Sequence, residues 1–258
     1  LGRIPKRTVR GALEACDAGD LADGDGCSST CTVEAGWGCT GSPSLCHEIC
    51  GDGIKTPGET CDDGNLVARD GCSPTCTLEL CSAAPVEGCR KPVEAGKASV
   101  GLKDKLGTAK DTLTWKWTHG AATTKADFGN PRFNTDYAIC LYDEKAGTPS
   151  LKLSVTAPHA GFCGSRSCWK DSNTGFAYSN SALVPDGKLK IVLKEGPVAG
   201  TAKITVTGKG ANLIMPALPL DQAGRVRVQV KNSNGLCWEA DYSTNNSNLP
   251  NQFNARSD

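Results

Sequence analysis

Cys61-Asp62-Asp63-Gly64-Asn65 and, shortly after it, Asp70-Gly71-Cys72-Ser73-Pro74-Thr75-Cys76 form the stretch that decides the fold of the N-terminal part of this chain. The segment from Cys16 to Cys31 repeats the same pattern. A shift of 45 residues superposes the cysteines, the Asp-Gly pairs and the closing Thr-Cys-Thr without a gap, and it then places Glu34 on Glu79. A gapless match of cysteines, acids and glycines predicts a repeated structural unit.

The repeated unit contains few apolar side chains. A hydrophobic core therefore cannot offset the conformational entropy that the unit loses when it folds. Cysteine cross-links are the alternative, since a disulfide closing a loop of this size contributes on the order of 3 kcal/mol by restricting the unfolded chain. We expect small, loop-rich repeats held together by several disulfides.

Acidic residues separated by glycines occupy the loops between these cysteines. Glycines permit the tight turns that bring carboxylate oxygens together, and clusters of oxygen ligands suit calcium. The pattern predicts calcium as a cofactor, bound by these residues: Asp17, Asp20, Asp23, Asp25, Asp62, Asp63, Asn65 and Asp70.

Three other interpretations compete with calcium binding at these loops. An EF-hand is excluded, because Thr32 stands where the closing glutamate is required. The Asp-Gly pairs can also serve simply as turn formers. Zinc is the third alternative, because the x3 spacings of Cys27 with Cys31 and of Cys72 with Cys76 fit metal ligands. We favour disulfides over zinc, since neighbouring acids oppose thiolate formation.

The second copy also resembles a known family. Cys50-Gly51-Asp52-Gly53, Gly58–Asn65, Asp70–Cys76 and Glu79 resemble the cysteine-rich disulfide repeat of secreted and surface proteins of myxobacteria and their relatives. The resemblance covers about residues 11 to 81 and implies an extracellular module rather than an activity. The first copy departs from the family pattern, because Pro5-Lys6-Arg7-Thr8 replaces its opening cysteine segment. Parts of the second half are similar to uncharacterised secreted bacterial proteins, which implies no function.

The cysteine content indicates the compartment. Fifteen cysteines in 258 residues favour an oxidising environment, and we expect the protein to be extracellular or on the cell surface. The sequence has no run of about 18 apolar residues, so we expect no transmembrane segment. Leu1-Gly2-Arg3-Ile4 lacks the charged start and apolar core of a signal peptide, and we expect the chain to be part of a longer precursor.

The net charge of zero conceals two oppositely charged halves. The net charge is −7 for residues 1–94 and +7 for residues 95–258. Within the first half, residues 1–10 form a basic arm of charge +4. Dense negative charge favours divalent cations, and opposite charges on the two halves favour head-to-tail association between copies. The bases of the second half are spread singly along strands without interleaved aromatics, so we expect no nucleic-acid partner.

From Lys97 onward, apolar and polar residues alternate with the period of half-buried strands. Strands are predicted at Leu113/Trp115/Trp117, Leu151/Leu153/Val155, Leu189/Ile191/Leu193, Ala202/Ile204/Val206 and Val226/Val228/Val230, with Tyr137–Tyr142 as a central strand. Their solvated faces are predicted to carry Lys190, Lys203, Arg225, Arg227 and Lys231.

Many short strands separated by turn signals predict an antiparallel β-sandwich of the jelly-roll type. The chain is therefore expected to be mainly β, with three parts. These are an N-terminal arm (1–10), two cysteine-rich Asp/Gly repeats (11–94) and a β-sandwich domain (95–258).

Cysteine arithmetic suggests a bond between chains. The four cysteines of the second half, Cys140, Cys163, Cys168 and Cys237, form an even set and are expected to pair among themselves. Eleven remain in the first half, so one of them lacks a partner within the chain. That cysteine can stay free, pair with a precursor segment, or bond to another chain. Together with the basic arm, this predicts a head-to-tail homopolymer in which residues 1–10 engage the next copy by strand addition or ion pairing.

Catalytic patterns are missing from the sequence. The three histidines stand in no metal-binding helix motif, and Gly161–Ser165 has a cysteine where a nucleophile elbow needs its serine. We do not expect an enzyme. The expected function is that of an extracellular structural or assembly protein, a calcium-binding and disulfide-stabilised subunit of a surface filament or layer.

A secreted adhesin or carbohydrate-binding module, with a polysaccharide as partner, is the alternative function. It would use aromatic side chains as a stacking platform, with these candidates: Trp115, Trp117, Trp169, Trp238 and Tyr178. Core packing is the simpler interpretation of these aromatics, because Trp115 and Trp117 alternate in step with Leu113.

Overall fold

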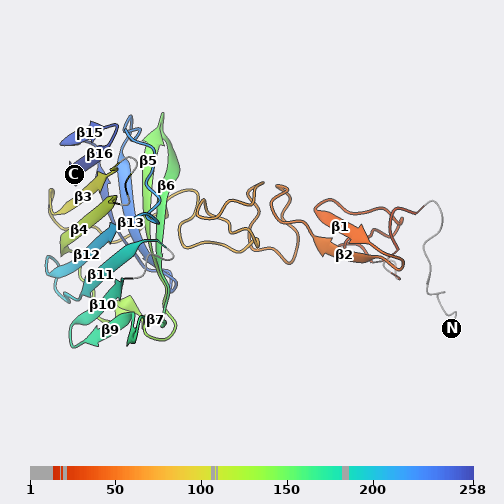
Figure 1. The fold of residues 1–258 in the computed structure, drawn as a ribbon, viewed down its shortest axis with the longest axis horizontal. Helices are drawn as coiled ribbons and strands as arrows, with labels where there is room; N and C mark the ends of the chain where they lie inside the picture. Colours follow the sequence, from red (N-terminus) through yellow and green to blue (C-terminus); the bar gives the residue numbers. More distant parts are fainter. Residues whose placement is uncertain (1–13, 18, 20–21, 106–107, 109, 182–185) are drawn as a thin grey trace. The chain divides into compact units, whose positions relative to one another are not determined.

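A computed structural model describes residues 14–17, 19, 22–105, 108, 110–181 and 186–258 (Figure 1). The predicted arm of residues 1–10 and the predicted ligand Asp20 lie outside the described residues. The chain divides into two compact units, Leu1–Glu79 and Leu80–Asp258. Among the described residues, no helix has the length and apolar composition needed to cross a membrane.

The C-terminal unit is built from two antiparallel sheets, which confirms the predicted mainly β sandwich (Figure 1). The larger sheet has eight strands in the order β15 (Ser247–Leu249), β16 (Gln252–Arg256), β3 (Ala98–Lys103), β4 (Thr112–Gly120), β12 (Ala202–Lys209), β11 (Lys188–Lys194), β10 (Gly175–Asn180) and β9 (Trp169–Ser172). The smaller sheet has four, in the order β14 (Cys237–Tyr242), β13 (Val226–Asn232), β5 (Tyr137–Lys145) and β6 (Thr148–Ala157). A short pair, β7 (Phe162–Cys163) with β8 (Arg166–Ser167), and the 3-10 turn η1 (Ala126–Phe128) complete the unit.

A hydrophobic core fills the space between the two sheets. This core is a single cluster of buried side chains from both sheets, and its members occur in the sequence between Ala98 and Ala255. The indole N–H of Trp115 on β4 donates to the Tyr242 hydroxyl of β14 at 2.9 Å, and the indole N–H groups of Trp117 and Trp238 also have hydrogen-bond acceptors inside the core. The aromatics considered as a stacking platform are all buried, which confirms core packing: Trp115, Trp117, Trp169, Trp238 and Tyr178.

The strands predicted from alternation are confirmed as β4, β6, β11, β12 and β13. The predicted central strand, Tyr137–Tyr142, is part of β5. β5 is buried on both faces because a segment formed by residues 80–92, here called the strap, contributes to covering the outer face of the smaller sheet. The Tyr142 hydroxyl of β5 donates to the Ser82 carbonyl, and Gln229 of β13 exchanges hydrogen bonds with the backbone of Val86.

Two disulfides pin the strap to the smaller sheet, namely Cys81–Cys140 and Cys89–Cys237. The predicted pairing of the last four cysteines among themselves is therefore wrong, because only Cys163 and Cys168 pair with each other. The strap lies within the compact unit that starts at Leu80, whereas the sequence placed residues 80–94 with the repeats.

The strap also changes the environment of two cations that were predicted to be solvated. Arg227 has a side chain that is only 11% exposed, and it forms ion pairs with Asp241 and with Glu87 of the strap. Lys231 donates to the Ser82 hydroxyl, and burial lowers the pKa of this lysine. The prediction of a solvated face is wrong for these two residues, since the covering segment could not be inferred from strand periodicity.

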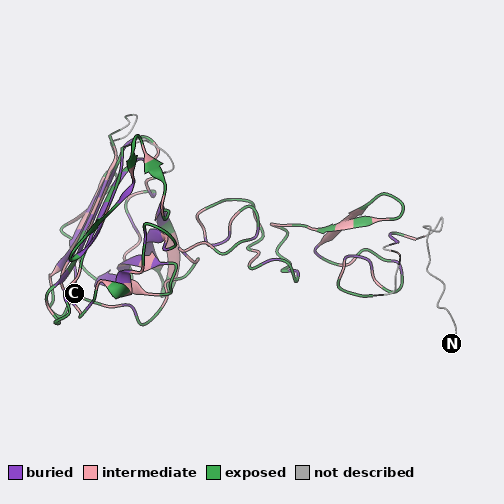
Figure 2. Cartoon of the chain, turned by 90° about the horizontal axis from the view of Figure 1, so that it is seen from below, coloured by how far each residue is buried: buried purple, intermediate pink, exposed green. Residues whose placement is uncertain are grey.

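In the N-terminal unit the described residues have almost no apolar core, as expected from composition (Figure 2). The buried apolar side chains between residues 14 and 79 are all cysteines, namely Cys16, Cys27, Cys31, Cys72 and Cys76. Four disulfides hold this unit, and these are Cys16–Cys27, Cys39–Cys46, Cys50–Cys76 and Cys61–Cys72. The hairpin of β1 (Trp37–Thr40) and β2 (Leu45–Glu48) is the sole sheet of its described part.

Seven disulfides in all cross-link fourteen of the fifteen cysteines, and Cys31, which is buried, lies outside them. The repeat explains its position. Cys31 corresponds to Cys76, whose partner Cys50 corresponds in turn to Pro5. The missing opening cysteine of the first copy is thus the counterpart that a disulfide of Cys31 would require.

Candidate functional site

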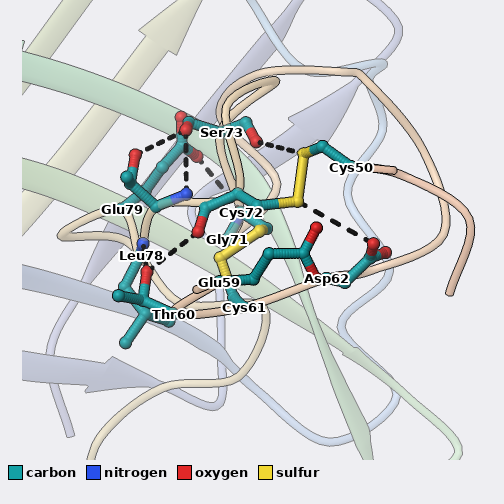
Figure 3. The surroundings of a disulfide bond; sticks show 12 residues. Cys50, Glu59, Thr60, Cys61, Asp62, Gly71, Cys72, Ser73, Leu78 and Glu79 are labelled. Atoms are coloured by element: carbon teal, nitrogen blue, oxygen red, sulfur yellow. Dashed lines mark hydrogen bonds between the residues drawn. A yellow bond between two sulfur atoms is a disulfide. The ribbon is translucent and has the colours of Figure 1, made fainter. Parts of the chain in front are cut away.

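The Asp62 carboxylate lies at the centre of the second Asp/Gly loop, beside the disulfide of Cys50 (Figure 3). Its two oxygens accept hydrogen bonds from the amides of Gly51, Gly53 and Gly64 at 2.8–2.9 Å. The amide of Gly64, together with those of Gly53 and Gly51, lowers the pKa of Asp62. Three backbone donors occupy most of the lone pairs of this carboxylate, so Asp62 acts as a brace of the loop.

Two glutamates close the loops in the same way, 45 residues apart. Glu34 accepts the amides of Gly24 and Gly26 at 2.8 Å, and Glu79 accepts those of Arg69 and Gly71 at 2.9 and 3.2 Å. The sequence matched these glutamates to each other but assigned them no role. The signal was present, since each acid follows an Asp-Gly-Cys turn at the same distance in both copies.

Other contacts also recur at the same offset. The disulfides Cys16–Cys27 and Cys61–Cys72 both span a sequence separation of 11 with Cα atoms 5.8 Å apart. In each loop a serine hydroxyl lies 2.6 Å from a threonine hydroxyl four residues later, as in Ser28 with Thr32. Residues 22–34 and 67–79 therefore share their loop geometry as well as their sequence pattern.

Asp63 and Asp70 are the two predicted ligands whose carboxyl groups meet. The Asp70 carboxylate is close enough to Asp63 to act on its ionisation, and Oδ1 of Asp70 is buried with no hydrogen-bond partner among the described residues. Partial desolvation, together with the negative charge of Asp70, raises the pKa of Asp63. Two carboxylates this close repel each other unless a proton or a cation lies between them.

The other described candidates are engaged with the backbone of their own loops. Asp17 accepts the amide of Gly19, Asp23 that of Ser29, and Asp25 that of Cys27. The side-chain carbonyl of Asn65 accepts the Val67 amide. The structure thus brings together Asp63 and Asp70, and it uses the remaining described candidates to shape the turns.

Thiolate zinc sites are not formed at the two x3 spacings, because Cys27, Cys72 and Cys76 are in disulfides. Glu59 also lies near the sulfur of Cys50 (Figure 3) and near that of Cys76. These sulfurs are bonded to each other, and the Glu59 carboxylate accepts the amide of Thr56 at 3.0 Å. The Glu59 carboxylate therefore holds the loop through its hydrogen bond to Thr56.

The repeated loop geometry coincides with a known family. Residues 33–77 match DUF4215, a domain of unknown function. The match contains Asp62, Asp63 and Asp70 together with the disulfides Cys50–Cys76 and Cys61–Cys72. No curated protein and no solved structure matches the chain.

Proposed function

We propose that this chain is an extracellular structural protein, in which disulfide-stapled Asp/Gly repeats bind calcium and mediate assembly into a surface filament or layer. The cross-linking supports an extracellular role, because seven disulfides are typical of proteins in oxidising compartments. The N-terminal unit resists unfolding through staples and amide-bound carboxylates rather than through a core, which suits a spacer or connecting element.

The single observation that carries the calcium proposal is the Asp63–Asp70 pair. It offers two carboxylates at close range and a buried oxygen on Asp70 that accepts no hydrogen bond. Hard cations with oxygen ligands suit such a pair, and the exposed side of Asp63 leaves room for water ligands. The raised pKa of Asp63 means that protons compete with the cation at acidic pH.

Assembly is proposed on the basis of sequence repetition and charge. A shift of 45 residues superposes Cys16–Thr32 on Cys61–Thr77, which lies within the matched residues 33–77, so we propose that the repeat occurs twice. The half of the chain that follows carries the opposite net charge. The basic arm of residues 1–10 is proposed to engage the acidic repeat of the next copy. Such a head-to-tail contact builds filaments when it does not close into a ring.

Calcium binding is tested by titration calorimetry of the purified chain at neutral pH. The double variant Asp63→Asn/Asp70→Asn is expected to weaken calcium binding at least tenfold. The matched control, Asp23→Asn/Asp52→Asn, removes two negative charges from the same unit. Its side-chain carbonyl oxygens can still accept the backbone amides of Ser29 and Ile54. Its calcium affinity should stay within twofold of the parent.

Thermal melting provides the second readout. Calcium at one hundred times its dissociation constant should stabilise the parent by about 2.7 kcal/mol, because it binds the folded form. The double variant at residues 63 and 70 should lose this increment. No heat of binding together with an unchanged melt would show that the pair is not a calcium site, as would equal losses in the two double variants.

A further inference from the structure

The outer face of the eight-stranded sheet carries an unusual concentration of positive charge. The strand register places nine exposed cations on this one face, here called the basic face: Lys103, Lys116, Lys170, Lys188, Lys190, Lys194, Lys203, Lys209 and Arg256. Seven of the eight strands contain no Asp or Glu, and Asp171 on the remaining strand pairs with Lys125. None of the nine cations forms an ion pair with another described residue.

Some of these charges are placed directly opposite each other. Lys188 on β11 pairs across the sheet with Lys209 on β12, and Lys194 pairs with Lys203. Like charges in opposed positions destabilise a sheet. The opposite side of the sandwich is arranged differently, since the cation of Arg227 there is neutralised by Asp241 and Glu87 and is covered by the strap. Among the described residues of the C-terminal unit, no comparable segment covers the basic face, and its nine cations are exposed.

The basic face is hollowed as well as charged. A hollow of about 850 Å³ extends across β3, β4, β10, β11 and β12, and it is lined by the five lysines Lys103, Lys105, Lys188, Lys190 and Lys209 together with hydroxyl side chains such as Thr114, Ser179 and Thr207. A second hollow of about 440 Å³ adjoins it across Lys103, Thr112 and Thr114, and it reaches Asn254 and Arg256. Among the described residues, no aromatic side chain lines either hollow.

We propose that the basic face binds an unbranched anionic polysaccharide, held through its carboxylate or sulfate groups by the lysines and through its hydroxyl groups by the threonine, serine and asparagine side chains. Neighbouring strands lie about 4.8 Å apart, so cations on successive strands form regularly spaced rows that suit a polymer with regularly spaced charges. This inference goes beyond the proposed function and requires neither calcium binding nor assembly.

The shape and chemistry of the face favour this polymer over other anions. Single-stranded nucleic acids need aromatic side chains on which bases stack, and duplex DNA is read by an element that enters a groove; the basic face offers neither. Neutral polysaccharides likewise depend on aromatic platforms. The acidic repeat of a second copy is the other candidate occupant, and the test below distinguishes it from a polysaccharide.

The experiment measures binding of the full chain to fluorescein-labelled oligogalacturonate and dextran sulfate by fluorescence anisotropy, with neutral dextran as a control, from 50 to 300 mM NaCl. The triple variant Lys188→Gln/Lys190→Gln/Lys209→Gln removes three charges from the larger hollow. The matched variant Arg132→Gln/Lys145→Gln/Arg166→Gln removes three charges from exposed positions outside the basic face. Circular dichroism verifies that both variants fold.

Binding to at least one of the two polyanions, but not to neutral dextran, is expected for the parent chain. The hollow variant should bind at least tenfold more weakly and show a salt dependence whose log–log slope is shallower by about two, because fewer counterions are released. The matched variant should stay within twofold of the parent. A carboxylate ligand is indicated if oligogalacturonate binds more tightly, and a sulfate ligand if dextran sulfate does.

Four results would overturn the proposal. The first is that neither polyanion binds at 100 mM NaCl, and the second is that both triple variants weaken binding equally, which would indicate bulk charge alone. The third is tighter binding of duplex DNA at equal charge concentration. In the fourth, the hollow variant abolishes self-association while polysaccharide binding is absent, which would assign the basic face to a second copy.

Discussion

The disulfide Cys89–Cys237 joins the strap to β14 and closes a loop with a sequence separation of 148 residues. The double variant Cys89→Ala/Cys237→Ala opens this loop. In the chain-entropy treatment, a cross-link of this length stabilises the folded state by about 5 kcal/mol. Because Cys81–Cys140 remains and shortens the effective loop, we expect the free energy of unfolding to fall by about 4 to 5 kcal/mol.

The disulfide Cys163–Cys168 offers a matched control in the same compact unit. It closes a loop with a sequence separation of five residues, so the corresponding double alanine variant should lose only about 2 kcal/mol. The comparison holds the number of removed bonds and sulfur atoms constant. It varies the length of chain that each bond restricts.

Guanidinium unfolding followed by tryptophan fluorescence measures both losses. The signal reports on the C-terminal unit, because four of the five tryptophans are buried in its core: Trp115, Trp117, Trp169 and Trp238. Equal destabilisation of the two double variants would refute the reasoning that loop length sets the contribution. A strap variant within 1 kcal/mol of the parent would show that the strap is held by its hydrogen bonds and ion pairs instead.

Two further predictions concern the first loop and the ion pairs beneath the strap. Gly26→Ala should destabilise the N-terminal unit by about 1 to 3 kcal/mol more than Gly24→Ala in chelator-free thermal melts, because both glycines have positive φ but only a Cβ at residue 26 would collide with neighbouring side chains; equal effects would contradict the packing seen there. Burial opposes ionisation of Asp241, but Lys91 and Arg227 outweigh it and lower the pKa of Asp241, so its contribution to stability is present above the unfolded value near 3.9 and is lost as the pH falls. Asp241→Asn should therefore flatten the decline of unfolding free energy between pH 5 and pH 2, and an unaltered slope would exclude this ion pair as its source.

The sequence was sufficient to predict the sandwich, because the relevant signal is local. Trp115 and Trp117 alternate with polar residues in step with Leu113, and period-two alternation depends only on which face of a strand is buried. The absence of an apolar core in the repeats was predictable for the same reason. Composition alone showed that the N-terminal loops had little besides cysteine to bury.

Contacts between distant segments were not predictable in this way. Nothing near Cys81 or Cys89 in the sequence indicates that their partners are Cys140 and Cys237, because pairing depends on how the strap lies on the smaller sheet. The burial of Arg227 was missed for the same reason.

The candidate sites were likewise predictable only in their local features. The Asp/Gly pattern located the loops, but which carboxylates meet depends on turn geometry, and the pattern could not separate the Asp63–Asp70 pair from Asp62, which braces the backbone. Lys190 and Lys203 were recognised as single outward-facing cations. These two lysines share one face with seven other cations because of the strand order and register, and alternation does not specify either of these.

Sedimentation velocity of the intact chain, in calcium and in chelator, tests the proposal of calcium-dependent assembly most directly. We expect species heavier than a single chain in calcium, dissociation in chelator, and loss of assembly when residues 1–10 are deleted. An intact chain that sediments as a monomer in calcium, or a truncated chain that assembles as the intact one does, would contradict it.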